Sequence, residues 1–132
     1  MIVEHSLLPK DKYDSKAVEK LNRLTEEQIQ PLIPSLLMWL QDINWPIALE
    51  VLPIIARHQN IAMPHIKSIF YTDDEIWKHW ILIYLVPLLT KGNLQVIKED
   101  LVYLSSPDKT ADEDVAETVR LSKECIALHF TE

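Results

Sequence analysis

Five side chains in the middle of the sequence are of types that could bind a ligand or carry out chemistry. They comprise two indoles, a carboxylate, an ammonium group and an imidazole: Trp45, Glu50, Trp77, Lys78 and His79. Tryptophan is over-represented at the hot spots of protein interfaces, so Trp45 and Trp77 are the first candidates for a binding surface. A carboxylate and an imidazole near them could instead form a pocket for a small molecule or a hydrolytic centre. Both interpretations start from the same group of residues.

Each of these residues also has a structural interpretation. Tryptophan packs readily in a core, with its N–H bonded to a carbonyl at a helix turn. Glu50 either reaches solvent through a narrow polar window or is partly buried with a partner, in which case it would be a candidate general base. Glu75 and His79 are four residues apart and could supply half of a metal site. We expect a surface hydrogen bond from His79 instead, and neither a metal nor a cofactor.

The composition excludes several classes of function. The chain has 132 residues but a single glycine, whereas Rossmann and P-loop phosphate sites need several glycines in one short loop. A net charge of -7 disfavours a nucleic-acid partner, since phosphate contacts need a concentrated basic face. No Ser-His-Asp, Cys-His or paired-carboxylate arrangement can be assembled from the sequence. We therefore expect a protein that is not an enzyme.

The sequence also predicts a cellular compartment. The lone Cys125 rules out an internal disulfide and fits a reducing environment, and its apolar surroundings predict a buried structural thiol. The longest apolar run, over 80–89, is about half the length that a membrane span requires. The first residues lack the charged-then-apolar layout of a signal peptide. These features favour a cytoplasmic protein without a membrane segment.

Helices must position the candidate residues, because proline and capping signals divide the chain into helical segments and scarce glycine argues against β-hairpins. We predict one domain over 1–132, with an extended arm over 1–13 and about seven helices. The predicted helices are 14–24, 31–41, 45–58, 62–71, 74–90, 93–104 and 112–129. The predicted helix-start residues are Asp14 or Ser15, Thr25 with Gln28, Asn44, Asn60, Asp73, Asn93, and Thr110 with Glu113, while Gly92 is predicted to end a helix.

Short connections should pair these helices as antiparallel hairpins. The predicted pairs are 31–41 with 45–58, 62–71 with 74–90, and 93–104 with 112–129. The second helices of the first two pairs are apolar on almost all sides, so we expect them to be buried all round. Trp45 and Trp77 begin these two helices and are therefore predicted to lie side by side.

Two stretches about thirty residues apart share a pattern that resembles HEAT repeats. The first copy runs from Leu36 to Asp42 and continues from Trp45 to Leu52, and the second runs from Ile69 to Asp74 and continues through Trp77. The resemblance implies an all-α fold, a short right-handed HEAT/ARM-like stack of helical hairpins. Such an α-α superhelix usually presents a groove to a partner.

The chain also resembles a family of small bacterial proteins known only as a domain of unknown function. The residues that carry this resemblance are 8–14, 39–46 and 74–80. It implies a helical repeat fold and no particular activity.

We therefore predict a non-enzymatic protein-binding module of the bacterial cytoplasm that uses Trp45, Glu50, Trp77, Lys78 and His79 in a groove. A more specific hypothesis is an immunity-type partner that neutralises a toxic protein, with acidic surface steering it to a basic target. The alternative is a small-molecule-binding or hydrolytic enzyme, with a pocket around Trp45, Glu50, Trp77 and His79.

Overall fold

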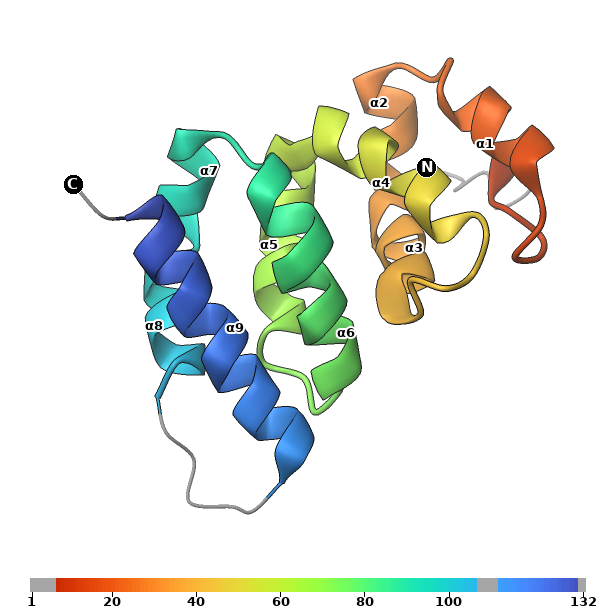
Figure 1. Cartoon of the computed structure of the whole chain (residues 1–132). Helices are drawn as coiled ribbons and strands as arrows, with labels where there is room; N and C mark the ends of the chain where they lie inside the picture. Colours follow the sequence, from red (N-terminus) through yellow and green to blue (C-terminus); the bar gives the residue numbers. More distant parts are fainter. Residues whose placement is uncertain (1–6, 107–111, 131–132) are drawn as a thin grey trace. The chain divides into compact units, whose positions relative to one another are not determined.

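The computed structural model describes residues 7–106 and 112–130, and all the regular structure in this part of the chain is helical (Figure 1). This confirms the predicted all-α class. The α-helices are α1 (Ser15–Leu21), α2 (Glu26–Ile29), α3 (Ile33–Met38), α4 (Ala48–Arg57), α5 (Gln59–Ile69), α6 (Glu75–Trp80), α7 (Lys91–Val96), α8 (Lys98–Leu104) and α9 (Glu113–His129). The chain divides into two compact units, Met1–Ala62 and Met63–Glu132, with the boundary inside α5. The single domain over 1–132 stays a prediction.

The first unit contains α1 to α4. Asp14 caps α1 by accepting a hydrogen bond from the backbone N–H of Ala17 at 3.2 Å. Thr25 and Gln28 form the predicted capping box at the start of α2. α3 and the 3-10 turn Trp39–Gln41 pack against α4, which confirms the first predicted hairpin, and α1 also packs on α4. The core of this unit is aliphatic: Leu21, Ile29, Ile33, Leu36, Leu37, Leu40, Ile47, Val51, Ile54 and Ile55.

The segment before α1 packs on the start of α4. The backbone N–H of Ile47 donates to the carbonyl oxygen of Lys12 at 3.2 Å, and Pro9 is buried. Turns and bends occupy most of the described part of the predicted arm, 7–13. Residues 1–6 of that arm lie outside the described residues.

The second unit is organised around α9, which packs against both α8 and α6 (Figure 1). The contact with α8 confirms the predicted hairpin of 93–104 with 112–129. Asp112 caps α9 by accepting hydrogen bonds from the N–H groups of Asp114 and Val115, at 2.8 and 3.2 Å. Thr110, predicted to form a capping box here, lies outside the described residues. The core of this unit includes Phe70, Ile81, Leu82, Leu85, Ile97, Leu101 and Leu121.

Cys125 lies in this core, as predicted, with 8% of its surface exposed. Its Sγ lies 3.8 Å from the carbonyl oxygen of Leu82. Burial raises the pKa of the Cys125 thiol to about 11, because the thiolate would lose its hydration. The side chain is a structural thiol that joins α9 to the turn after α6.

Two predicted helix starts are wrong by a few residues. The helix expected from Trp45 begins at Ala48, because the N–H of Trp45 donates to the carbonyl oxygen of Asp42 and a turn precedes the helix. Asp74 rather than Asp73 caps α6, since its carboxylate accepts from the N–H of Trp77 at 3.0 Å. An N-cap side chain must reach an N–H two or three residues further on, and the path of the backbone selects which of the two neighbouring aspartates does so.

Three further expectations about helix ends are also wrong. Asn60 lies inside α5 and does not begin it. Thr90, not Asn93, caps α7, because its hydroxyl accepts from the N–H of Asn93. Gly92 is therefore inside α7 and has no positive φ, so it is not a helix-ending glycine. The predicted helix 93–104 is divided at Ile97 into α7 and α8.

The two second helices are not buried all round, contrary to expectation. Leu49 is 52% exposed and Ile83 is 42% exposed, so each helix keeps an open face. The predicted helix 74–90 continues from α6 into a π-helical turn, Ile81–Leu85, and a 3-10 turn, Val86–Leu88. Pro87 explains the change of winding, since it has no N–H to donate to the carbonyl oxygen four residues earlier. Within the described residues, no helix has both the length and the apolar surface needed to cross a membrane.

Candidate functional site

Trp45 and Glu50 both lie in the first unit. Trp45 is half-buried and packs edge-on against Trp39, with ring centroids 5.4 Å apart and planes at 76°. These two rings line a small apolar cavity of about 300 Å³ together with Met38. Glu50 is exposed, as the solvent-window interpretation expects, and the hydroxyl of Ser15 donates to its carboxylate at 3.1 Å.

Trp77, Lys78 and His79 lie on α6 in the second unit. Trp77 is half-buried, while Lys78 and His79 are only 6% and 7% exposed. Nε2 of His79 lies 2.8 Å from the backbone carbonyl oxygen of Asp114. A carbonyl oxygen only accepts, so this nitrogen carries the hydrogen. The expected surface hydrogen bond is therefore a buried one, and it joins α6 to the first turn of α9.

The half metal site that Glu75 and His79 could have supplied gains no support from the partners of Glu75. The carboxylate of Glu75 binds Lys78 and Thr118 instead. No group of three His, Cys, Asp or Glu side chains is placed to hold a metal ion in the part of the chain that the structure describes. The five predicted residues thus form two sets, one in each unit, and the side-by-side placement of Trp45 and Trp77 stays a prediction.

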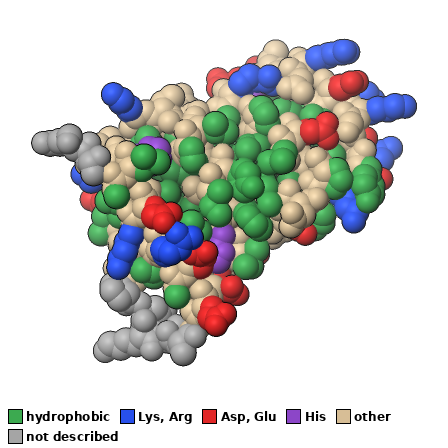
Figure 2. All heavy atoms as spheres, in the orientation of Figure 1, with side chains coloured by type: hydrophobic (Ala, Val, Ile, Leu, Met, Phe, Trp, Pro, Cys, Tyr) green, Lys and Arg blue, Asp and Glu red, His purple; other side chains and the backbone are tan. Residues whose placement is uncertain are grey.

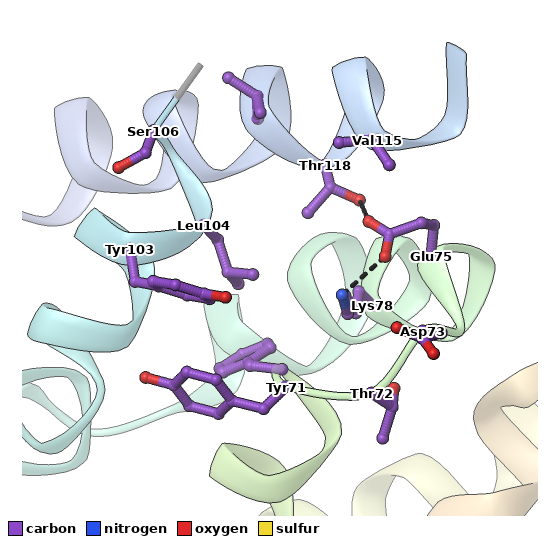
Figure 3. Close-up of a pocket in the computed structure, with 12 residues that line it drawn as sticks. Tyr71, Thr72, Asp73, Glu75, Lys78, Tyr103, Leu104, Ser106, Val115 and Thr118 are labelled. Carbon is purple, nitrogen blue, oxygen red and sulfur yellow. Dashed lines mark hydrogen bonds and ion pairs between the residues drawn. The ribbon is translucent and has the colours of Figure 1, made fainter. Parts of the chain in front are cut away.

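A cavity of about 570 Å³ opens in the second unit (Figure 3). Its walls come from the segment between α5 and α6, the C-terminal end of α8 and the first turns of α9. Of the five predicted residues, only Lys78 lines it. Its other polar lining includes Tyr71, Asp73, Glu75, Tyr103 and Thr118.

Two tyrosines form one wall of this cavity. The rings of Tyr71 and Tyr103 face each other, with centroids 4.9 Å apart and planes tilted by 30° (Figure 3). They are 55% and 58% exposed, which is high for side chains of this size. Tyr71 is held from behind, because its hydroxyl donates to Oδ1 of the buried Asp100 at 2.7 Å. Nζ of Lys67 lies 3.7 Å from the other oxygen of that carboxylate.

The hydrogen bond to Asp100 changes the titration of Tyr71. It raises the pKa of Tyr71 to about 12, with burial and the negative charge of Asp100 acting in the same direction. Tyr71 therefore stays a neutral hydrogen-bond donor at physiological pH. Tyr71 consequently gives the wall of the cavity a fixed, uncharged aromatic ring.

A buried polar network closes the opposite side of the cavity. Nζ of Lys78 lies 2.6 Å from Oε2 of Glu75, and the hydroxyl of Thr118 donates to Oε1 of Glu75 at 2.8 Å (Figure 3). The side chains of Lys78 and Glu75 are 8% and 16% exposed. Charges that are this buried need partners, and here each is the partner of the other. The network also joins α6 to α9.

Most residues of this site carry no signal in the sequence. Tyr71 and Tyr103 lie on different elements, and no spacing rule relates them to each other or to Thr118. The only sequence signal was the i, i+3 spacing of Glu75 and Lys78, which is typical of helix surfaces and not of a cavity wall. The remaining residues come together through packing of α8 and α9 on α6.

A family model described as a domain of unknown function (DUF5071) matches residues 7–126. The matched stretch contains both cavities and every candidate residue discussed above. No curated protein matches the sequence.

Proposed function

The chain belongs to the family described as a domain of unknown function (DUF5071), and we propose that it is a non-enzymatic protein-binding module. The observation that carries this proposal is the pair of exposed tyrosines, Tyr71 and Tyr103, at a cavity of about 570 Å³ in the second unit. We place the binding site there.

The tyrosine pair has the properties of an interface hot spot. Tyrosine offers a large contact area and a polar tip with only two side-chain torsions to fix. Tyr71 is already held by its hydrogen bond to Asp100 and its contact with Tyr103. A side chain that is ordered before binding loses little entropy on binding, so more of the contact energy remains as affinity.

The polar groups around the cavity support binding rather than catalysis. Both carboxylate oxygens of Glu75 already have partners, Oε2 in the ion pair with Lys78 and Oε1 as acceptor from Thr118. The alternative enzyme pocket gains no support from its own residues. Nε2 of His79 is bonded to a backbone carbonyl, and Glu50 lies exposed at the surface of the first unit.

We further propose a HEAT/ARM-like right-handed stack of hairpins that presents Trp45 and Trp77 as a second contact surface. The proposed location is the bacterial cytoplasm. A net charge of -7 supports a basic partner, and an immunity-type role that neutralises a toxic protein is the most specific form of the proposal.

The proposal is tested by affinity capture from a lysate of the native host. The bait is the full chain as wild type, Tyr103→Ala, Tyr71→Ala/Tyr103→Ala, and the control Val102→Ala. Val102 neighbours Tyr103 on α8 and is 51% exposed, but it does not line the cavity. Circular dichroism melts establish that each variant is folded.

We expect one protein, identified by mass spectrometry, to be retained by the wild type and by Val102→Ala. Tyr103→Ala should reduce its recovery, and the double variant should abolish it. Equal recovery by a folded double variant would overturn the assigned site. Absence of any stoichiometric partner would overturn the binding module itself.

A further inference from the structure

We infer that the cavity at Tyr71 and Tyr103 accepts a basic side chain of the partner, with arginine the best fit. This inference rests on the proposed function and specifies the chemistry of the partner. It follows from the charges that line the cavity, from the aromatic faces exposed there and from the burial of Lys78, the one cation among the described lining residues, in an ion pair.

The charges that line the cavity have a negative excess. Asp73 and Glu75 contribute two carboxylates and Lys78 contributes one ammonium group. Glu75 and Lys78 neutralise each other in their ion pair, so the remaining charge is that of Asp73. This residue is exposed and forms no ion pair with any residue in 7–106 or 112–130. A cation that enters the cavity would therefore meet an uncompensated carboxylate.

The surroundings of the cavity are acidic as well. Asp112, Glu113 and Asp114 are exposed at the start of α9, directly before Val115, which lines the cavity. Figure 2 shows acidic side chains gathered over this first turn of α9. Neighbouring charges of one sign raise the local concentration of an oppositely charged group and speed its association.

The aromatic wall adds a second preference for a cation. The π face of tyrosine is negative and attracts a cation placed within about 6 Å of the ring centroid. Tyr71 and Tyr103 are 55% and 58% exposed, although each ring turns one face to the other. Guanidinium is planar, stacks on aromatic faces and is more weakly hydrated than ammonium, so arginine satisfies the ring and the Asp73 carboxylate together.

An acidic or phosphorylated partner fits this cavity poorly. The only cation among its lining residues that the structure describes is Lys78, which is 6% exposed and 2.6 Å from Glu75. An incoming anion would have to displace Glu75 from a buried ion pair. The carboxylate of Asp73 would also repel it. Loss of the ion pair and this repulsion both disfavour the binding of an anion.

The test is a titration of the full ¹⁵N-labelled chain by NMR with three small probes. Nα-acetyl-arginine amide carries the charge, Nα-acetyl-citrulline amide is its neutral isostere, and Nα-acetyl-glutamate amide carries the opposite charge. We expect amide shifts at Tyr71, Asp73 and Tyr103 with the arginine probe, with a dissociation constant of about 1–10 mM for so small a ligand. The dissociation constant of the citrulline probe should be at least about tenfold higher.

Two variants test the role of the carboxylate. Asp73→Asn should weaken the arginine probe about fivefold, as expected for one partly exposed charge pair, and reduce its dependence on salt. Glu27→Gln removes an exposed carboxylate from α2 in the first unit that does not line the cavity, so it should leave the affinity unchanged. Equal binding of the arginine and citrulline probes, or an unaltered affinity in Asp73→Asn, would overturn the inference.

A library of random heptapeptides, screened against the full chain, separates this inference from the proposed function. Cavity-binding peptides rich in arginine support both. Cavity-binding peptides that are acidic or purely apolar overturn the arginine inference and leave the binding module intact. No peptide and no probe at the cavity would overturn both.

Discussion

Tyr71 donates its phenolic hydrogen to Oδ1 of Asp100 over 2.7 Å, and this bond ties the segment before α6 to the first turn of α8. Asp100 is only 5% exposed, whereas Tyr71 is 55% exposed. The buried end of the pair thus fixes the orientation of the open end. A single hydrogen bond between residues 29 positions apart sets the aromatic wall on which the proposed function depends.

The Tyr71 pair predicts a late tyrosine titration. Because the folded-state pKa is about 12 against an ordinary value of 10.0, the bond contributes stability that is fully present below pH 10 and is lost as the pH rises through 12. Absorbance at 295 nm should show one tyrosine ionising about two pH units late, and Tyr71→Phe should remove that step. If all tyrosines of the folded wild type ionise together near pH 10, the hydrogen bond is not formed in solution.

The Glu75–Lys78 pair predicts unequal effects of removing either partner. Glu75→Ala leaves the buried ammonium group of Lys78 without its carboxylate, and we expect a loss of about 3 kcal/mol in the free energy of unfolding. Lys78→Met keeps the volume and leaves Glu75 bonded to Thr118, so the loss should be smaller. Urea denaturation of both single variants and the double variant measures this. Strictly additive losses would show that the two side chains do not interact.

The edge-on contact of Trp39 with Trp45 should be measurable as a coupling energy. Such aromatic pairs contribute about 0.5–1.5 kcal/mol beyond the area they bury. A double-mutant cycle of Trp39→Ala and Trp45→Ala in urea should therefore give a coupling of about 1 kcal/mol. Leu49→Ala is the control, because Leu49 is 52% exposed and its loss should change stability by less than about 0.5 kcal/mol. A zero coupling would place the rings apart in solution.

Gly92→Ala should stabilise the protein, because Gly92 lies inside α7 and not at a left-handed helix end. An added Cβ would meet its nearest atom, Oγ1 of Thr90, at an ordinary 4.0 Å. Removing the backbone freedom of glycine from the unfolded chain should add about 0.5–1 kcal/mol. Thermal denaturation measures the change, with Lys91→Ala as the control. A lower midpoint of thermal denaturation for Gly92→Ala would indicate that Gly92 ends a helix, as predicted from the sequence.

Cys125 should resist thiol reagents in the folded protein. Its pKa is raised by burial from 9.0 to about 11, so the thiolate fraction at pH 8 should fall about 100-fold. The associated stability is present below pH 9 and is lost as the pH rises through 11. Reaction with a chromogenic disulfide should be at least that much slower in buffer than in denaturant. Equal rates would show that α9 does not cover the thiol.

The sequence by itself determined the all-helical class and several of the local features that define the helices. The capping box of Thr25 with Gln28 was found because its bonds join residues three apart, which the sequence displays directly. Asp14 was one of two candidate caps for α1, and the structure selects it over Ser15. The burial of Cys125 was predicted from the apolar residues next to it in the sequence. Errors arose where two neighbouring residues could both act as the N-cap, as with Asp73 and Asp74 before α6.

Only the tertiary structure decided the site. Glu75 meets Thr118 across 43 positions and Tyr71 meets Asp100 across 29, and no local rule selects such partners. Which faces of α6, α8 and α9 meet depends on how all of their apolar side chains fill the core together. For this reason the sequence displayed the conspicuous tryptophans, whereas the packing brought together the tyrosines and the buried ion pair.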